Sequence, residues 1–99
     1  MPAFDTLPLK PALLASIDAL GYTDMTPVQA QSLPPMLEGR DVIAQAQTGS
    51  GKTAAFGLSL LQALDADTIR LQALVLCPTR ELADQVGKSI RKLAANIPN

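Results

Sequence analysis

Residues 41–53 read DVIAQAQTGSGKT, and this stretch decides the fold. Its first half, Asp41–Ala46, is too short and too β-branched for a helix, which predicts a buried strand. Its second half is a glycine-rich turn, after which residues 51–64 are compatible with a helix. A strand that leads through a tight turn into a helix begins a βαβ unit. We therefore expect an α/β fold, with helices on the faces of a parallel sheet.

The turn carries a phosphate-binding pattern. Residues 46–53 match G-x-x-x-x-G-K-[ST] except at the first position, where Ala46 replaces glycine. The glycines permit backbone angles that turn successive N–H groups inward, which makes a nest for a polyphosphate at the N-terminus of a helix. Lys52 would reach the β- and γ-phosphates, and the Thr53 hydroxyl would bind Mg²⁺. An ordinary glycine-rich turn with a solvated lysine is disfavoured, because the string is rare by chance and lies between a strand and a helix.

The whole chain is expected to run helix, helix, strand, helix, strand, helix. Thr26 and Gln29 have the spacing of a capping box at the start of the second helix, and Thr79 is placed to cap the last one. The predicted helices cover residues 11–20, 27–38, 51–64 and 80 onward, and the predicted strands cover residues 41–46 and 71–77. The third helix is expected to present Phe56, Leu60, Leu61 and Leu64 on one face.

Composition excludes several classes of protein. The 99 residues include no histidine and one cysteine, Cys77, so histidine-dependent nucleophilic catalysis, an internal disulfide and an ordinary zinc site are excluded. The net charge of −1 argues against a generally basic surface. No apolar run approaches the roughly 18 residues of a membrane span, so a soluble cytoplasmic chain without membrane contact is expected. Lys88, Arg91 and Lys92 are expected to form a solvated helix face, and Cys77 a buried strand position.

Three ordered motifs resemble those of the DEAD-box RNA helicases. Residues 46–53 resemble motif I of that family, which tolerates alanine at the first position, and residues 78–83, PTRELA, are identical to its motif Ia. Gly21-Tyr22 followed by residues 26–29 resembles its Q motif, although Met25 stands where the family most often has proline. Phe4 lies upstream, where the family keeps an isolated aromatic residue. Within the family the chain looks most like the bacterial DEAD-box protein A type, which is associated with large-subunit ribosomal RNA.

The resemblance implies a fold and an activity. Residues 1–39 would be the helical Q-motif region, and residues 40–99 would be part of a RecA-like core of the P-loop NTPase class. The chain would be the N-terminal ATP-binding segment of an ATP-dependent RNA helicase that remodels RNA duplexes. ATP and Mg²⁺ would be the cofactors, and the partner would be RNA, specifically ribosomal RNA, rather than DNA. The rest of the helicase core, or a partner chain, would complete the sheet.

The resemblance also assigns roles to single residues. The nucleotide-binding set would be Phe4, Tyr22, Gln29, Ala46, Gln47, Thr48, Gly49, Ser50, Gly51, Lys52 and Thr53, of which Lys52 and Thr53 would also be catalytic. Within this set Gln29 would bond the adenine edge, Phe4 would stack on the adenine and Tyr22 would shape the pocket. Pro78, Thr79 and Arg80 would contact the RNA backbone. Two simpler interpretations stay open. Gln29 and Phe4 could serve only a capping box and a hydrophobic contact, and Arg80 could pair with Glu81 or Asp84 beside a helix cap.

The 99 residues lack parts that hydrolysis requires. The Asp-Glu-Ala-Asp string of the family is absent, and Asp65 and Asp67 do not replace it because they end a helix rather than a strand. We therefore expect no hydrolysis by these residues alone. A non-enzymatic nucleotide-binding or subunit-interaction module, completed by a partner chain, is the alternative, and a compact P-loop kinase is disfavoured. In the family's strand order the two predicted strands are not neighbours. The isolated chain is thus expected to expose strand edges and to be partly unfolded, self-associated or ordered only with a partner.

Overall fold

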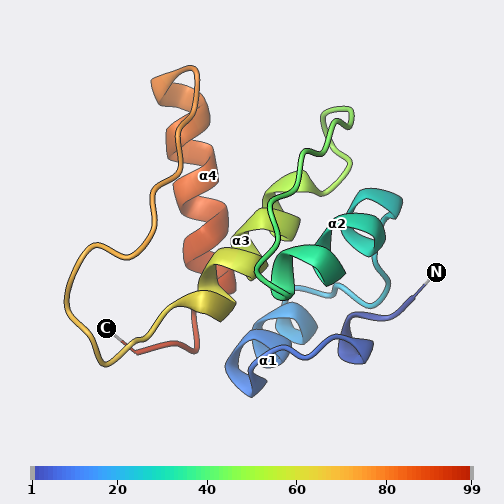
Figure 1. Ribbon diagram of the computed structural model, residues 1–99, viewed down its shortest axis with the longest axis horizontal. Helices are drawn as coiled ribbons and strands as arrows, with labels where there is room; N and C mark the ends of the chain where they lie inside the picture. The colour runs from blue at the N-terminus through green and yellow to red at the C-terminus, as the bar shows by residue number, and fades with distance from the viewer. Residues whose placement is uncertain (1, 99) are drawn as a thin grey trace.

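The computed structural model describes residues 2–98 and shows a helical scaffold built around one central helix (Figure 1). α3 lies between α2 and α4, and α1 packs against both α3 and α4. Within the described residues the elements are η1 (Phe4–Thr6), α1 (Pro11–Ala19), α2 (Pro27–Leu37), α3 (Lys52–Ala63) and α4 (Arg80–Leu93). The four predicted helices are therefore confirmed. Over residues 2–98 no helix is long and apolar enough to cross a membrane.

The helix ends follow the local sequence signals. Thr26 and Gln29 form the predicted capping box at the start of α2, and α2 continues through its two prolines to Leu37. The Thr79 hydroxyl accepts a hydrogen bond of 3.1 Å from the Leu82 N–H at the start of α4. Each cap satisfies backbone donors that a helix N-terminus leaves without a partner. The caps therefore place the starts of α2 and α4 where the sequence indicated.

The core joins all four helices. Its most deeply buried side chains are Leu13, Leu33 and Leu58, and the full set of buried hydrophobic residues in this cluster is Phe4, Leu9, Leu13, Ile17, Met25, Leu33, Ala55, Leu58, Leu61 and Leu93. The expected face of α3 is wrong in part, because Phe56, Leu60 and Leu64 are only half-buried. The buried stripe is Ala55, Leu58 and Leu61 instead, since α3 is covered by other helices on that side.

Three hydrogen bonds connect α1 and its N-cap residue Lys10 to the rest of the scaffold. The Lys10 ammonium donates 2.7 Å to the Leu64 carbonyl just after α3, and the Lys10 N–H donates 2.8 Å to Gln62 Oε1. A cation at this end of a helix complements the partial negative charge of the helix dipole. The Asn96 side chain, beyond α4, donates 3.1 Å to the Ser16 hydroxyl. Residues far apart in the sequence thus hold α1 beneath α3 and α4.

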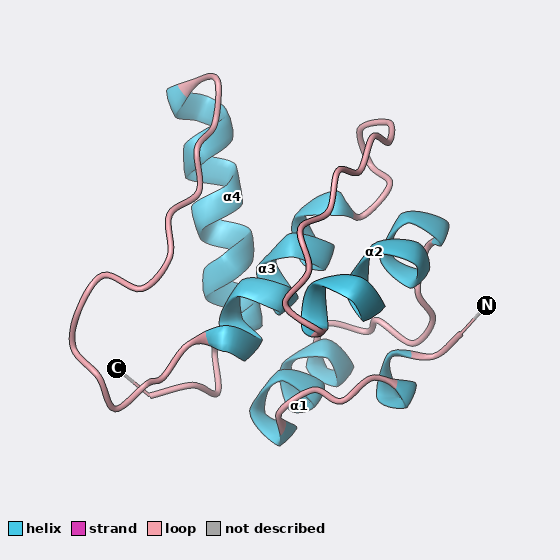
Figure 2. Cartoon of the chain, viewed as in Figure 1, coloured by secondary structure: helices cyan, strands magenta, loops and turns pink. Residues whose placement is uncertain are grey.

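The predicted parallel sheet is not formed in the part of the chain that the structure describes. Asp41–Ala46 and Leu71–Cys77 are irregular (Figure 2), and the β-pairing observed within residues 2–98 is an isolated antiparallel bridge between Ala3 and Asp24. A strand needs a neighbour to pair its N–H and C=O groups. Neither segment has such a neighbour within these residues. Because neither segment forms a strand among the described residues, the expectation that the two are not neighbours in a sheet stays a prediction.

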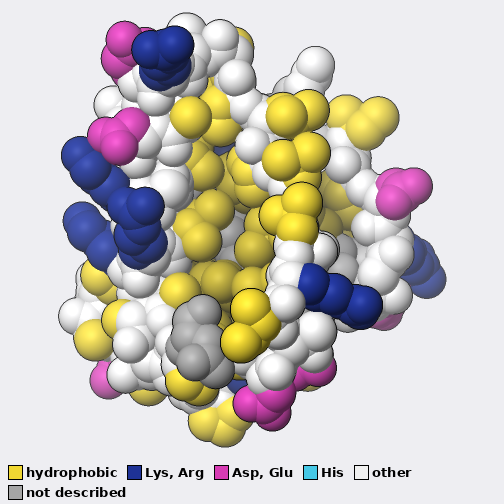
Figure 3. Space-filling view, turned by 90° about the vertical axis from the view of Figure 1, so that its left-hand side faces the viewer, with side chains coloured by type: hydrophobic (Ala, Val, Ile, Leu, Met, Phe, Trp, Pro, Cys, Tyr) yellow, Lys and Arg dark blue, Asp and Glu magenta, His cyan; other side chains and the backbone are white. Residues whose placement is uncertain are grey.

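The two irregular segments border an open groove of about 1250 Å³. Val42 and Ala44 line it from one segment and residues 74–78 from the other. The remaining lining comes from α2, α3 and α4, from the glycine-rich loop, and from the N-terminal part of the chain before α2. Large hydrophobic side chains are exposed along these segments and the preceding loop, namely Ile43, Ile69, Leu71, Leu74 and Leu76. Figure 3 shows hydrophobic side chains gathered over the middle of one face. Cys77 is half-buried rather than buried, because the strand that would enclose it is not formed.

Candidate nucleotide-binding site

The glycine-rich loop turns sharply into the N-terminus of α3. Gly49 and Gly51 have φ angles of +85° and +89°, in the left-handed region that favours glycine. At Gly51 a Cβ atom would lie 2.3 Å from the Gln29 amide nitrogen, so any other residue would displace that side chain. The Ser50 N–H donates 3.2 Å to the Gln47 carbonyl and closes the turn. The loop therefore has the tight backbone that the phosphate-binding pattern predicts.

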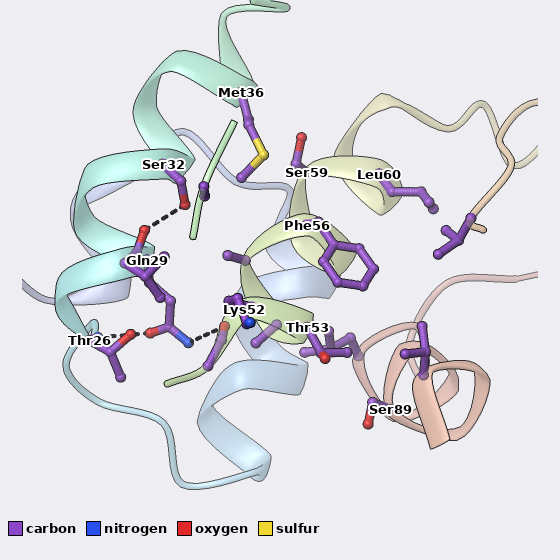
Figure 4. A pocket seen from close by; sticks show the side chains of 18 of the residues that line it. Thr26, Gln29, Ser32, Met36, Lys52, Thr53, Phe56, Ser59, Leu60 and Ser89 are labelled. Atoms are coloured by element: carbon purple, nitrogen blue, oxygen red, sulfur yellow. Dashed lines mark hydrogen bonds between the residues drawn. The ribbon is translucent and has the colours of Figure 1, made fainter. Parts of the chain in front are cut away.

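Lys52 and Thr53 are the first two residues of α3, and both line the groove (Figure 4). The Lys52 ammonium donates to the Ala46 carbonyl, so the side chain bridges the two ends of the loop. A lysine at the first position of a helix is repelled by the positive end of the helix dipole. A bound anion at that end would remove this repulsion and satisfy the free N–H groups of the first turn.

Thr26 and Gln29, from the stretch that resembles the Q motif, are hydrogen-bonded to this loop. The Gln29 amide nitrogen donates 3.1 Å to the Gly51 carbonyl, and its oxygen accepts 2.9 Å from the Thr26 N–H. The Thr26 hydroxyl donates 2.7 Å to the Ser50 carbonyl. Figure 4 shows the Gln29 side chain reaching from α2 to the loop before α3. The structure thus brings together two motifs separated by about twenty residues in the sequence.

Gln29 is buried, with 5% of its surface exposed. Its side-chain amide can still form hydrogen bonds beyond those to Thr26 and Gly51. A glutamine amide has two N–H donors and two acceptor lone pairs. One of each is engaged by Gly51 and Thr26, which leaves one donor and one acceptor. The capping role is therefore confirmed, and it is compatible with the adenine-binding role, which stays a prediction.

Phe4 and Tyr22 form a stacked aromatic pair at the rim of the groove. Their ring centroids are 6.3 Å apart, with 29° between the ring planes. Phe4 is 3% exposed and belongs to the core, whereas Tyr22 is 44% exposed. Phe4 thus makes the hydrophobic contact of the simpler interpretation. Its stacking on adenine stays a prediction, and Tyr22 offers the more accessible aromatic surface.

Pro78, Thr79 and Arg80 are exposed at the start of α4. Asp84 forms its ion pair with Lys88, at 3.0 Å, and the described residues show no ion pair between Arg80 and either Glu81 or Asp84. The alternative pairing of Arg80 is therefore wrong in this structure. Arg80 is the first residue of α4, so one phosphate could accept from its guanidinium and from the free N–H groups of the helix's first turn.

Asp65 belongs to a local turn after α3. Its carboxylate accepts hydrogen bonds from the Thr68 hydroxyl at 2.7 Å and from the Asp67 N–H at 3.1 Å. These bonds, the one from Thr68 first, hold the pKa of the Asp65 carboxyl below its ordinary value.

Within residues 2–98 there is no group of three or more metal-ligating side chains. The Thr53 hydroxyl and the phosphate oxygens of a nucleotide would together suit Mg²⁺, because Mg²⁺ keeps most of its waters in such sites.

Two features of the site leave no signal in the sequence. The capping box assigns the Thr26 hydroxyl to its own helix, yet this hydroxyl donates to the loop, and the spacing of Thr26 and Gln29 alone gives no sign of the contact. Among the buried side-chain polar atoms of residues 2–98, the Ser50 hydroxyl oxygen has no hydrogen-bond partner. A buried polar atom without a partner is costly. Its position inside the loop points to a polar ligand there.

Comparison with known proteins identifies helicases as relatives of this chain. The DEAD/DEAH box helicase family matches residues 26–99. The chain is 62% identical over 100 residues to the ATP-dependent RNA helicase DbpA of Escherichia coli K12, which covers the whole chain and 22% of that protein. It is 48% identical over 93 residues to the DEAD-box ATP-dependent RNA helicase CshA of Bacillus cereus, covering 94% of the chain and 18% of the relative. The chain thus spans about a fifth of the length of these curated relatives.

Solved structures of the same kind share this scaffold. A DEAD box protein from Methanococcus jannaschii matches with a TM-score of 0.92 and 35% identity, covering 100% of this chain and 27% of that one. S. cerevisiae Dbp5 bound to RNA and ADP BeF3 matches with a TM-score of 0.91 and 37% identity, covering 96% of this chain and 25% of that one. The family match spans well over half of the residues, and it includes the capping box, the glycine-rich loop and the start of α4. The chain belongs to the DEAD/DEAH box helicase family.

Proposed function

We propose that this chain is the N-terminal ATP-binding segment of an ATP-dependent RNA helicase. The observation that carries the proposal is the set of hydrogen bonds that joins Gln29 and Thr26 to each other and to the glycine-rich loop. These bonds hold the Gln29 amide next to the glycine-rich loop, so the amide could bind the base of the same nucleotide whose phosphates the loop would bind. The comparisons support the same function, because relatives that cover the chain are named ATP-dependent RNA helicases.

The loop residues would hold the triphosphate. N–H groups of residues 49–53 would donate to the β-phosphate, because they lie at the N-terminus of α3. The Lys52 ammonium would leave the Ala46 carbonyl for the β- and γ-phosphate oxygens and stabilise the charge on the transferring group. The Thr53 hydroxyl would be a ligand of Mg²⁺, which neutralises phosphate charge when it is bound.

Gln29 would select the base. Its remaining donor and acceptor match the edge of adenine, where a donor and an acceptor are adjacent, and oppose guanine. Burial and the bonds to Thr26 and Gly51 hold the amide in one orientation. Base selection would therefore need no movement of α2. Phe4 or Tyr22 would add an aromatic surface for the base.

Pro78, Thr79 and Arg80 would contact an RNA backbone at the start of α4. Support comes from the exposed guanidinium of Arg80 and from the similarity to Dbp5, whose structure contains RNA. These contacts are to phosphate and carry no base sequence. Ribosomal RNA as the substrate is the finer part of this proposal, and it rests on the likeness to the DEAD-box protein A type.

A second candidate function rests on the exposed segments. A nucleotide-binding module without its own activity would use the apolar groove and residues 71–77 to dock on a partner chain that supplies strands. The two candidates differ in one respect. Only the helicase segment is joined to the acidic residues that hydrolysis needs.

The proposal is tested by ATP hydrolysis in the intact protein that contains this chain. We expect turnover to rise several-fold on addition of RNA, and to stay at its basal level with DNA of the same sequence. Hydrolysis that RNA does not change would contradict the helicase assignment. Nucleotide binding without any hydrolysis would favour the non-enzymatic module.

A further inference from the structure

α3 and α4 cross closely at Gly57. This residue is buried in the middle of α3, and a Cβ at its position would lie 3.2 Å from Leu93 Cδ1 and 3.4 Å from Ile90 Cγ1. Both distances are shorter than the roughly 3.5–4.0 Å at which two carbon atoms attract most strongly. The missing side chain is therefore what allows α4 to pack this closely on α3.

The two helices that meet at Gly57 carry different parts of the proposed machinery. α3 begins at Lys52, directly after the phosphate loop, and α4 begins at Arg80, directly after Thr79. Gly57 lies less than two turns from Lys52. The crossing thus links the nucleotide-binding end of one helix to the proposed RNA-binding end of the other.

The first half of α4 has little other support within the described residues. Residues 80–85 are all exposed, and Val86 is the first buried residue of the helix. The N-terminal end of α4 stands away from α3 (Figure 1). From Ile90 to Arg80 the helix extends about 15 Å at 1.5 Å per residue. A tilt of α4 at the crossing would therefore be carried to Thr79 and Arg80.

We propose that Gly57 is a positioning residue that sets the spacing of α3 and α4, and thereby places Thr79 and Arg80 relative to Lys52. The inference rests on the proposed function, because it concerns the coupling of RNA binding to the nucleotide site. It needs no contact between Gly57 and either ligand.

The test compares Gly57→Ala with Gly87→Ala in the intact protein. Gly87 lies in α4, and a Cβ there meets nothing within 4 Å. Both substitutions raise helix propensity by the same amount, so the difference between them isolates packing at the crossing. We expect Gly57→Ala to raise the KM for RNA in stimulated hydrolysis by about three- to tenfold, because small displacements of a binding group are costly. The KM for ATP without RNA should stay within about twofold, and Gly87→Ala should change neither.

A rescue variant separates positioning from general destabilisation. Leu93→Val shortens the side chain that an alanine at position 57 would meet first. The double variant should therefore regain most of the RNA affinity. If the single variant Gly57→Ala does not fold, the double variant is compared with Leu93→Val instead. These two proteins should then have the same KM for RNA.

Three results would overturn the inference alone: an unchanged KM for RNA in Gly57→Ala, an equal rise in the KM for ATP, or no recovery in the double variant. Lack of RNA stimulation in the unsubstituted protein would instead overturn the proposed function, and the inference with it.

Discussion

At the scale of single residues, Gln29 connects the base-binding and phosphate-binding parts of the site. Replacing it with alanine removes partners from the Thr26 N–H and the Gly51 carbonyl, which costs about 1–3 kcal/mol of unfolding free energy. We predict that Gln29→Ala in the intact protein also narrows the preference for ATP over GTP, measured by competition binding. Gln31→Ala, exposed on the same helix, is the control and should change neither quantity. Equal binding of ATP and GTP by the unsubstituted protein would show that Gln29 is only a capping residue.

Asp65 gives a prediction about pH at the same scale. Hydrogen bonds to its charged form lower its pKa in the folded protein. The stabilisation they supply is present above the pKa of the unfolded chain, and it is lost as pH falls through the lower, folded-state pKa. It is small because the carboxylate is fully exposed. NMR titration should show the pKa rising towards its ordinary value in Thr68→Val, but not in Thr6→Val. A pKa that is the same in all three proteins would contradict the assigned bonds.

At the scale of elements, local signals were sufficient for helices and insufficient for strands. Helix starts depend on residues within one turn, so Thr26 and Thr79 are enough to place the starts of α2 and α4. A strand depends on partners far along the chain, and residues 41–46 and 71–77 find none among the described residues. The glycine-rich loop was predicted because its pattern is local. The bond from Thr26 to Ser50 was not, because it joins residues of two elements.

The cap of α4 can be tested as an element. Thr79→Ala removes the acceptor of the Leu82 N–H, and we predict a loss of about 1 kcal/mol in unfolding free energy. Thr79→Ser keeps the hydroxyl and should retain most of the stability. Denaturant unfolding of the intact protein measures both variants. Equal stability of the alanine and serine variants would show that the cap contributes nothing.

At the scale of the whole molecule, the helices form a scaffold whose groove is bordered by two unpaired apolar segments. We predict that amides in Val42–Ala46 and Ala73–Cys77 of the 99-residue chain exchange rapidly with solvent, while amides in the centre of α3 are protected. In the intact protein both segments should become protected, because further strands would pair with them. A dilute monomer of the 99-residue chain with cooperative protection in both segments would show that they pair directly with each other, against this structure.

The proposed role of the loop before α3 is to bind the triphosphate of ATP during hydrolysis. Lys52→Ala in the intact protein tests this role more directly than any other substitution. The variant lacks the charge that would lie on the transferring phosphate, so we predict a fall in kcat of about 10²- to 10³-fold with saturating RNA. Lys88→Ala, which removes an exposed lysine paired with Asp84 on α4, is the matched control and should keep kcat. A near-normal kcat in Lys52→Ala, measured by steady-state phosphate release, would contradict the role assigned to the loop.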